Sequence, residues 1–255
     1  MKRRDGRTLD GITVLITRPA ERSARLVDLL EERGARVIVA PTIAIRPARS
    51  AALTRALRDL AAGRFRWIVL TSPATVGMLD ERLASPRDVR ADVAAIGDGT
   101  AEAFARWADR EVDLRAARFT TAGLARAFPR GDGRVLCARA DIAPEGLEDA
   151  LAAKGWSPTR VDAYRTVFPT SLPAEARRAL ASGVVDVVTF TSASTVRGFV
   201  GAVGQVGAAP KIVSIGPVTS KEAREHGLRV HAVADPHTTE GLVAAIERAL
   251  RRAPA

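Results

Sequence analysis

The chain has 255 residues, 47% of them apolar, and a formal net charge of +10 at pH 7. This length fits one or two domains, and the apolar content is typical of a globular protein rather than a disordered one. The longest apolar runs, such as 12–16 and 184–188, are too short to cross a membrane, and no apolar stretch of signal-peptide type follows the basic residues 1–7. A single cysteine can form no internal disulfide. We therefore expect a cytoplasmic globular protein without a membrane segment.

The positive charge does not by itself indicate a nucleic-acid-binding protein. Only four of the 39 basic residues are lysines, the basic residues are scattered, and there is one tyrosine to alternate with them. A basic balance also suits a small polyanionic ligand. We therefore expect no nucleic-acid partner; a nucleic-acid-binding protein would instead show steeply salt-dependent binding to DNA.

Short apolar runs alternate with helical patterns, which predicts an α/β fold with parallel sheets. The runs are nearly continuous in Val, Ile and Leu, as in strands covered on both faces. Between the first two strands, Pro19 is expected in the first turn of a helix that Gly34 ends, and Ser50 is expected to cap the next helix. The expected strands, in chain order, are 12–16, 36–40, 67–71, 93–96, 112–114, 135–138, 160–167, 186–190, 211–215 and 228–233.

The sequence contains two copies of one pattern. The offset between the copies drifts only from 121 to 118 residues, and the order of the matches is kept. A period this long is too large for a solenoid and indicates two similar domains, which commonly form a cleft. The matching segments are 14–18 with 135–139, 71–76 with 191–196, 96–100 with 215–219, and 121–124 with 239–242.

Two extended segments, 41–47 and 162–169, interrupt the alternation at equivalent places in the two copies. Each copy therefore divides into a front part, strand–helix–strand, and a back part of three strand–helix units. The two domains could be contiguous. The first front part could also share a domain with the last back part, around an inserted domain. These residues alone leave both arrangements open.

Small polar residues and glycines follow several expected strands, directly before helices. This carboxyl edge of a parallel sheet is where ligands bind, because helix N-termini present free backbone N–H groups and a partial positive charge there. Arg18 and Arg139 end equivalent strands and could bind carboxylates. The Ser and Thr residues could equally be N-caps with no further role. The uncharged candidates are Thr71, Ser72, Gly97, Thr100, Thr191, Ser192, Gly216 and Thr219.

Other motifs indicate no cofactor and no metal. The segment that begins at Gly97 starts like a dinucleotide fingerprint but lacks its third glycine. His226, His231 and His237 have no metal-ligand spacing. Cys137 lies in an expected buried strand and is interpreted as a packing residue rather than a nucleophile.

Taken together, the chain resembles the uroporphyrinogen-III synthase family. The order and spacing of the shared segments carry the resemblance, which extends from about Gly11 to Leu250. The segments are Leu15–Pro19, Leu70–Ser72 with its repeat Phe190–Ser192, Ala163–Thr166, Ile215–Thr219 and Thr238–Leu242.

This resemblance implies the interleaved arrangement of two similar parallel-sheet α/β domains with a cleft between them. Residues 1–42 and 170–255 would form domain one and residues 48–161 an inserted domain two, with a two-stranded hinge made by linkers 41–48 and 162–169. It also implies a cofactor-free lyase that converts the linear tetrapyrrole hydroxymethylbilane into uroporphyrinogen III, with inversion of ring D and loss of water. The eight carboxylates of this substrate suit a site rich in donors and positive charge. We expect a monomer that contacts hydroxymethylbilane synthase at most transiently.

Tyr164, the only tyrosine, lies in the second linker segment. In the family pattern it is the leading candidate to assist departure of the substrate hydroxyl. A phenol with a pKa of about 10 stays protonated at neutral pH and can donate a hydrogen bond to the leaving oxygen. The alternative is a tyrosine that only packs between the domains. For the whole protein, the alternative is a non-catalytic two-domain relative of the synthase that binds an acidic ligand or acts as a regulator.

Overall fold

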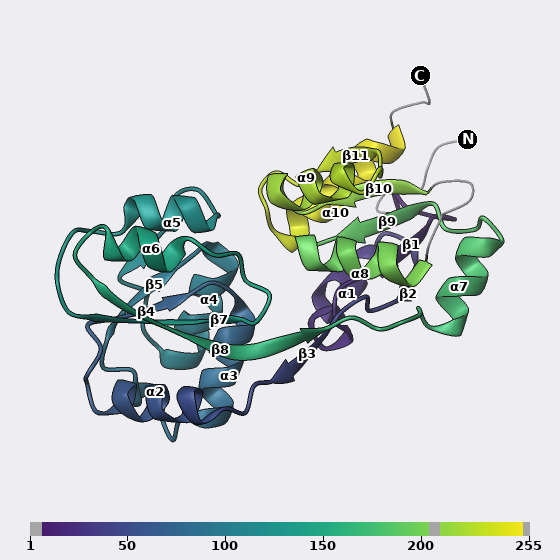
Figure 1. The fold of residues 1–255 in the computed structure, drawn as a ribbon. Coiled ribbons are helices and arrows are strands. Elements are labelled where there is room, and N and C mark those ends of the chain that lie inside the picture. Colours follow the sequence, from purple (N-terminus) through teal and green to yellow (C-terminus); the bar gives the residue numbers. More distant parts are fainter. Residues whose placement is uncertain (1–6, 204–209, 252–255) are drawn as a thin grey trace. The chain divides into compact units, whose positions relative to one another are not determined.

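The chain divides into two compact units. The computed structural model describes residues 7–203 and 210–251, so the ends of the predicted first domain, 1–6 and 252–255, lie outside the described residues. Unit 1 contains Met1–Ala44 and Val167–Ala255, and unit 2 contains Ile45–Thr166. The chain thus leaves unit 1 once, builds unit 2 and returns (Figure 1). None of the helices in the described ranges is both long and apolar enough to span a membrane.

Unit 1 is built on a five-stranded parallel sheet in the order β11-β10-β9-β1-β2. Leu15 of β1, an interior strand, lies opposite Ile38 on one side and Val188 on the other, and all three side chains are buried. The first strands of the chain therefore share a sheet with the last ones. The strands are β1 (Thr13–Ile16), β2 (Arg36–Val39), β9 (Val187–Phe190), β10 (Lys211–Ser214) and β11 (Val230–Val233).

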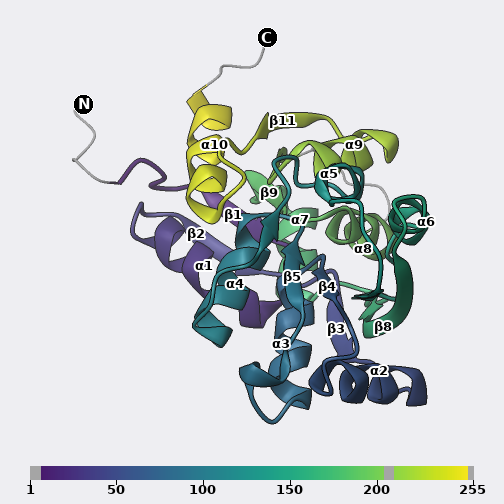
Figure 2. The ribbon, with the colours of Figure 1, turned by 90° about the vertical axis from the view of Figure 1, so that its left-hand side faces the viewer.

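Helices cover both faces of this sheet, as its continuous apolar strands predict. Figure 2 shows α1 (Ala24–Glu31) and α10 (Thr239–Arg251) on the same side, where leucines of both helices are buried in one cluster. The other face carries a second cluster, in which the rings of Phe190 and Phe199 lie 5.3 Å apart. The helices of that face are α7 (Ala174–Ala181), α8 (Ala193–Val203) and α9 (Pro217–Glu225).

Unit 2 contains a six-stranded sheet in the order β3-β8-β7-β4-β5-β6. Helices α5 and α6 cover one side of it, and α2, α3 and α4 cover the other (Figure 1). The strands are β3 (Ala44–Pro47), β4 (Trp67–Leu70), β5 (Asp92–Ala95), β6 (Leu114–Arg115), β7 (Arg134–Ala140) and β8 (Ser157–Val167). The helices are α2 (Ala51–Ala61), α3 (Pro73–Arg82), α4 (Asp98–Ala108), α5 (Thr121–Ala127) and α6 (Leu147–Ala152), with 3₁₀ turns η1 (Ala20–Arg22) in unit 1 and η2 (Pro86–Asp88) in unit 2.

The two sheets share one strand order. The order β2-β1-β9-β10-β11 in unit 1 corresponds to β8-β7-β4-β5-β6 in unit 2. The junctions are β1 with β9 and β7 with β4, so the front part of each sequence copy shares a sheet with the back part of the other. The expected α/β class with parallel sheets is confirmed, and the sequence duplication corresponds to two sheets of the same topology.

The two segments that connect the units belong to the sheet of unit 2. β3 and β8 are neighbours in that sheet, and the boundaries between the units fall after Ala44 and after Thr166. β8 is eleven residues long and begins at Ser157, three residues before the expected strand. The second connection is therefore a continuation of a long strand rather than a separate linker.

Two local predictions have different outcomes. Ser50 caps α2 as predicted, since its hydroxyl accepts a hydrogen bond from the Leu53 N–H at 3.0 Å. The prediction that Pro19 occupies the first turn of an α-helix is wrong. Pro19 is extended, with ψ at 140°, and precedes η1, so that α1 begins only at Ala24.

Candidate functional site

The predicted site residues of unit 1 gather at the carboxyl edge of its sheet. The ends of β1, β9 and β10 are neighbours, because Ile16 pairs with Thr189 and Phe190 pairs with Ser214. Arg18 follows the end of β1, and Thr191 and Ser192 follow the end of β9. Gly216 follows the end of β10, and Thr219 lies in the first turn of α9.

Unit 2 has the same arrangement. Leu70 at the end of β4 pairs with Ala95 of β5 and Ala138 of β7, so three strands end together. The predicted residues at this edge are Thr71, Ser72, Gly97, Thr100 and Arg139. Each unit therefore brings its own predicted residues together.

Ser72 and Ser192 are N-caps. Ser72 Oγ accepts from the Ala74 N–H at 3.1 Å, and Ser192 Oγ accepts from the Thr195 N–H at 3.2 Å. Ser192 Oγ also lies 2.9 Å from Ser194 Oγ. Both serines are half-buried. A hydroxyl that accepts one hydrogen bond can still donate its own proton, so capping leaves room for a ligand contact.

Thr100 and Thr219 occupy the same position in equivalent helices. Each is the third residue of its helix, and they are 3% and 4% exposed. Within the described ranges neither hydroxyl takes part in a hydrogen bond. The two side chains therefore keep hydrogen-bonding capacity in the first turns of α4 and α9.

Both helices begin with a glycine N-cap covered by a ring. A Cβ atom at Gly97 would lie 2.9 Å from the ring of Phe119, and a Cβ atom at Gly216 would lie 3.5 Å from the ring of His237. Phe119 and His237 are themselves exposed. The absence of a side chain at each N-cap leaves the backbone of the first turn close to these rings. The sequence pattern gave no sign of the two rings, because they come from loops that precede the following helices.

Arg139 lies near the end of β7 and is paired within unit 2. Its side chain is 1% exposed, and its Nη1 donates to both carboxylate oxygens of Glu148, at 3.1 and 3.0 Å. Its Nε is buried and has no hydrogen-bond partner within the described ranges. The charge of Arg139 is therefore already paired inside unit 2, and its direct contact with a ligand carboxylate stays a prediction.

Arg18 differs from Arg139 although the repeat aligns the two. It is half-buried, donates from Nη1 to the Arg22 carbonyl oxygen at 3.2 Å, and has no carboxylate partner in the described part of the chain. Burial, followed by the like charge of Arg22, lowers the pKa of Arg18 from its usual value. A bound anion would relieve both effects.

Tyr164 lies at the carboxyl edge of unit 2, opposite Ala140 at the end of β7. The pairing of β7 with β8 shifts register between Arg139 and Ala140, so Tyr164, rather than Ala163, stands at that level. Ala163 and Tyr164 are consecutive buried residues, and Tyr164 is 7% exposed and belongs to the apolar cluster under α2 and α3. Such bulges re-aim side chains near functional sites. Packing inside unit 2 thus fixes the ring, and the contact of its hydroxyl with a substrate stays a prediction.

A network of buried threonines supports the edge of unit 1, and the sequence did not reveal it. Thr42 Oγ1 donates to the Thr195 carbonyl oxygen at 2.8 Å, and its N–H donates to the Thr17 carbonyl oxygen at 3.0 Å. Thr17 Oγ1 donates to the Thr189 carbonyl oxygen at 2.7 Å. All four threonines are at most 1% exposed. These threonines are far apart in the sequence, so only the fold shows their connection.

Cys137 is fully buried in β7, as predicted for a packing residue. Burial, with the charge of Glu148 adding to it, raises the pKa of its thiol to about 12. A thiol with this pKa stays protonated at neutral pH and is a poor nucleophile.

The histidines make separate local contacts. His226 Nε2 lies 3.2 Å from Glu222, and His237 Nδ1 lies 2.8 Å from the Ala234 carbonyl oxygen. His231 Nδ1 accepts from the Ile212 N–H at 3.0 Å. The part of the chain that the structure describes contains no group of three or more potential metal ligands.

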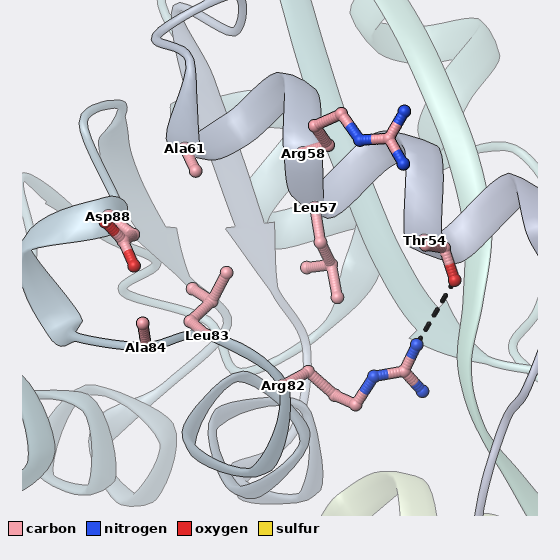
Figure 3. A pocket seen from close by; sticks show the side chains of 8 residues that line it. All are labelled: Thr54, Leu57, Arg58, Ala61, Arg82, Leu83, Ala84 and Asp88. Atoms are coloured by element: carbon pink, nitrogen blue, oxygen red, sulfur yellow. Dashed lines mark hydrogen bonds between the residues drawn. The ribbon is translucent and has the colours of Figure 1, made fainter.

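Two surface pockets lie away from the predicted residues. One, of about 280 Å³, lies between α2 and the end of α3 in unit 2, where Arg82 Nη2 donates to Thr54 Oγ1 at 3.3 Å (Figure 3). The other, of about 510 Å³, lies in unit 1 beside the ion pair of Arg36 with Glu175. Neither is lined by a predicted site residue.

The amino-acid sequence matches one family of known proteins. The family model described as uroporphyrinogen-III synthase HemD matches residues 24–244. The chain is 32% identical to the uroporphyrinogen-III synthase of Synechococcus elongatus, over 96% of this chain and 97% of that protein. It is 26% identical to the uroporphyrinogen-III synthase of Chlorobaculum parvum, over 94% of this chain and 99% of that protein.

Solved structures agree at the level of the fold. A mutant uroporphyrinogen III synthase from Thermus thermophilus matches with a TM-score of 0.68 at 21% identity, over 94% of this chain and 99% of that one. The uroporphyrinogen-III synthetase of Helicobacter pylori matches with a TM-score of 0.61 at 16% identity, over 94% and 100%. The sequence matches and the shared fold together show that the chain belongs to the uroporphyrinogen-III synthase family.

Proposed function

We propose that this protein is a uroporphyrinogen-III synthase, a lyase that closes hydroxymethylbilane into uroporphyrinogen III with inversion of ring D and loss of water. The observation that carries the proposal is the family match along residues 24–244, which includes the predicted site residues of both carboxyl edges except Arg18. A named relative 32% identical over nearly the whole length of both chains supports the same activity.

The two carboxyl edges supply what a flexible polyanionic substrate requires. Each offers a glycine-capped helix N-terminus, a serine hydroxyl and a threonine hydroxyl in the first helical turn. Helix N-termini and hydroxyls bind carboxylates without a strong acid or base. We assign substrate contacts to Arg18, Thr191, Ser192, Gly216 and Thr219 of unit 1. The contacts of unit 2 are assigned to Thr71, Ser72, Gly97 and Thr100.

The chemistry proposed for the site is mainly control of geometry. The C–O bond of the terminal hydroxymethyl group breaks, the hydroxyl leaves as water with an added proton, and the pyrrole nitrogen stabilises the resulting cation. Tyr164 is assigned the hydrogen bond to the leaving oxygen, because a neutral phenol can donate one at pH 7. Holding the chain so that ring D reacts at its substituted carbon then determines which isomer forms.

Units 1 and 2 are the two domains of this enzyme in our proposal, with unit 2 inserted into unit 1. The two boundaries between them, in β3 and at the end of β8, support hinge-like connections. The protein is proposed to act in the cytoplasm as a monomer that receives its unstable substrate through transient contact with hydroxymethylbilane synthase.

The decisive experiment is an isomer analysis. The purified protein is mixed with freshly made hydroxymethylbilane, the products are oxidised, and the porphyrin isomers are separated. An excess of type III over the unassisted type I product is expected. Formation of type I alone would exclude the synthase and favour the alternative, a non-catalytic relative that binds an acidic ligand.

A further inference from the structure

We infer that the two carboxyl edges are specialised. Each edge has two cationic positions, the arginine near the end of the first strand and the N-terminus of the glycine-capped helix. In unit 1 these positions receive carboxylates of the ligand, whereas in unit 2 carboxylates of the protein itself occupy them. This inference rests on the proposed function, since it concerns how the same substrate is held. The duplication makes it testable, because the positions at the carboxyl edge of one unit have equivalents in the other.

The first comparison concerns the equivalent arginines. Arg139 is neutralised by Glu148, the second residue of α6. α1 and α6 correspond in register, since buried Leu26 and Leu30 of α1 match buried Leu147 and Leu151 of α6 at the offset of 121 residues. At that offset Val27 stands where Glu148 stands in unit 2. Arg18 therefore has no built-in counterion.

The second comparison concerns the helix N-termini that carry the glycine caps. α4 begins with Asp98, whose carboxylate lies 2.8 Å from Arg115. At the offset of 119 residues the first residue of α9 is Pro217, and the first turn of α9 contains no acidic residue. Arg115 pairs with Ala95 as Val233 pairs with Ser214, so the partner of Asp98 is also missing from unit 1. The positive end of α9 is thus not compensated by an acidic residue of its own first turn.

Further groups at the start of α9 fit an anion. Thr219 lies in the first turn of the helix and is 4% exposed. Its hydroxyl forms no hydrogen bond within the described ranges. The ring of His237 lies over Gly216, with its Nδ1 2.8 Å from the Ala234 carbonyl oxygen. In unit 2 the equivalent ring is the apolar Phe119.

The two comparisons give the same result from unrelated pairs of residues. Unit 2 has a carboxylate at both cationic positions, and unit 1 has one at neither. Buried or half-buried cations without a counterion are costly, so a ligand carboxylate gains most at Arg18 and at the start of α9. Unit 2 is left with uncharged contacts from Ser72, Thr100 and Tyr164.

The experiment installs in unit 1 the carboxylates that unit 2 already has. Val27→Glu is compared with Val27→Gln, and Pro217→Asp with Pro217→Asn, so that each pair differs only in charge. An exposed valine far from the carboxyl edge, Val184, is changed to Glu as a control for net charge. The measurements are KM for hydroxymethylbilane, the Kd for uroporphyrin (the oxidised product, with the same eight carboxylates) by fluorescence, and Tm.

Val27→Glu and Pro217→Asp are each expected to raise KM and Kd about tenfold above their amide counterparts, as for the loss of one charge-assisted hydrogen bond. Val184→Glu should leave both constants within about twofold of wild type, since an exposed charge farther away than the Debye length is screened. Equal constants for the acidic and amide variants at both positions would overturn the inference. If Val27→Glu lowers Tm, the Pro217 pair decides, because position 217 is exposed.

The outcomes separate the inference from the proposed function. A wild-type protein that forms type III product while the acidic and amide variants bind alike would retain the function and lose the inference. A wild-type protein that forms only type I product would lose the function, and the uroporphyrin titrations would still decide where carboxylates bind.

Discussion

Gly198 of α8 lies directly against the backbone of Thr42. A Cβ atom at position 198 would lie 1.9 Å from the Thr42 carbonyl oxygen, which is far inside van der Waals contact. Thr42 is held in place from two sides, since its Oγ1 donates to the Thr195 carbonyl oxygen and its N–H to the Thr17 carbonyl oxygen. The segment that leads into β3 is therefore pressed onto α8 and has little room to move.

We expect Gly198→Ala to lower the free energy of unfolding by about 1–3 kcal/mol, the usual cost of overpacking. Gly201 provides the matched control in the same helix, because nothing lies within 4 Å of a Cβ atom there. Gly201→Ala should be neutral or stabilise by about 0.5–1 kcal/mol through helix propensity. Urea denaturation of the two variants checks this, and similar unfolding midpoints for both would contradict it.

Ser72 and Ser192 should affect both stability and catalysis if they are caps that also contact substrate. Ser72→Ala and Ser192→Ala are each expected to cost about 1 kcal/mol of unfolding free energy through the lost cap and, in addition, to lower kcat/KM. Ser50 caps α2 away from the carboxyl edge, so Ser50→Ala should show the same loss of stability with unchanged kcat/KM. If all three variants retain wild-type kinetics, the serines only cap helices.

Tyr164→Phe removes one oxygen and keeps the buried ring. Since the ring packs in the cluster under α2 and α3, we expect little change in Tm. Loss of the hydrogen bond to the leaving hydroxyl should lower kcat about tenfold to a hundredfold, which reaches the lower end of the range for general acid catalysis. Steady-state kinetics with fresh hydroxymethylbilane measures this. Full activity would restrict Tyr164 to packing and would leave the family assignment unchanged.

The strands could be predicted because apolar runs in a doubly covered sheet have a simple signature. Their ends could not, and β6 shows why. The sequence places this strand at 112–114, but Asp113 uses its carboxylate to accept the Val93 N–H at 2.8 Å, so ladder pairing begins only at Leu114. A side chain that replaces a backbone partner leaves no trace in an apolar pattern.

The carboxyl edges could also be predicted, but the difference between their charges could not. Arg18 and Arg139 occupy the same place in the repeat, and only the packing of α6 shows that Glu148 reaches one of them. The position of Tyr164 could not be predicted either. A register shift between β7 and β8 places Tyr164, rather than Ala163, opposite Ala140. The ion pair of Arg139 and the register of β8 both depend on which segments pack against each other, and the sequence pattern does not show this.

His231 makes the stability of unit 1 depend on pH. Its Nδ1 accepts the Ile212 N–H, in the place that Asp113 holds in unit 2, so protonation of that nitrogen would break the bond. Burial, with the positive charges of Arg229 and Lys211 adding to it, lowers the pKa of His231 below its usual value. The unfolded chain therefore takes up the proton first as pH falls. The stabilisation is fully present above about pH 6.5 and is lost as pH falls from there through the lowered pKa.

The free energy of unfolding should accordingly decrease as pH falls from about 6.5 through the lowered pKa of His231. In His231→Asn the side-chain oxygen can accept the same N–H without titrating, so this decrease should become smaller. His226, which lies in the same unit beside Glu222, serves as the control, and His226→Gln should retain the wild-type decrease. Denaturation curves recorded at several pH values for the three proteins measure the slopes. A slope in His231→Asn as steep as in wild type would show that another group is responsible.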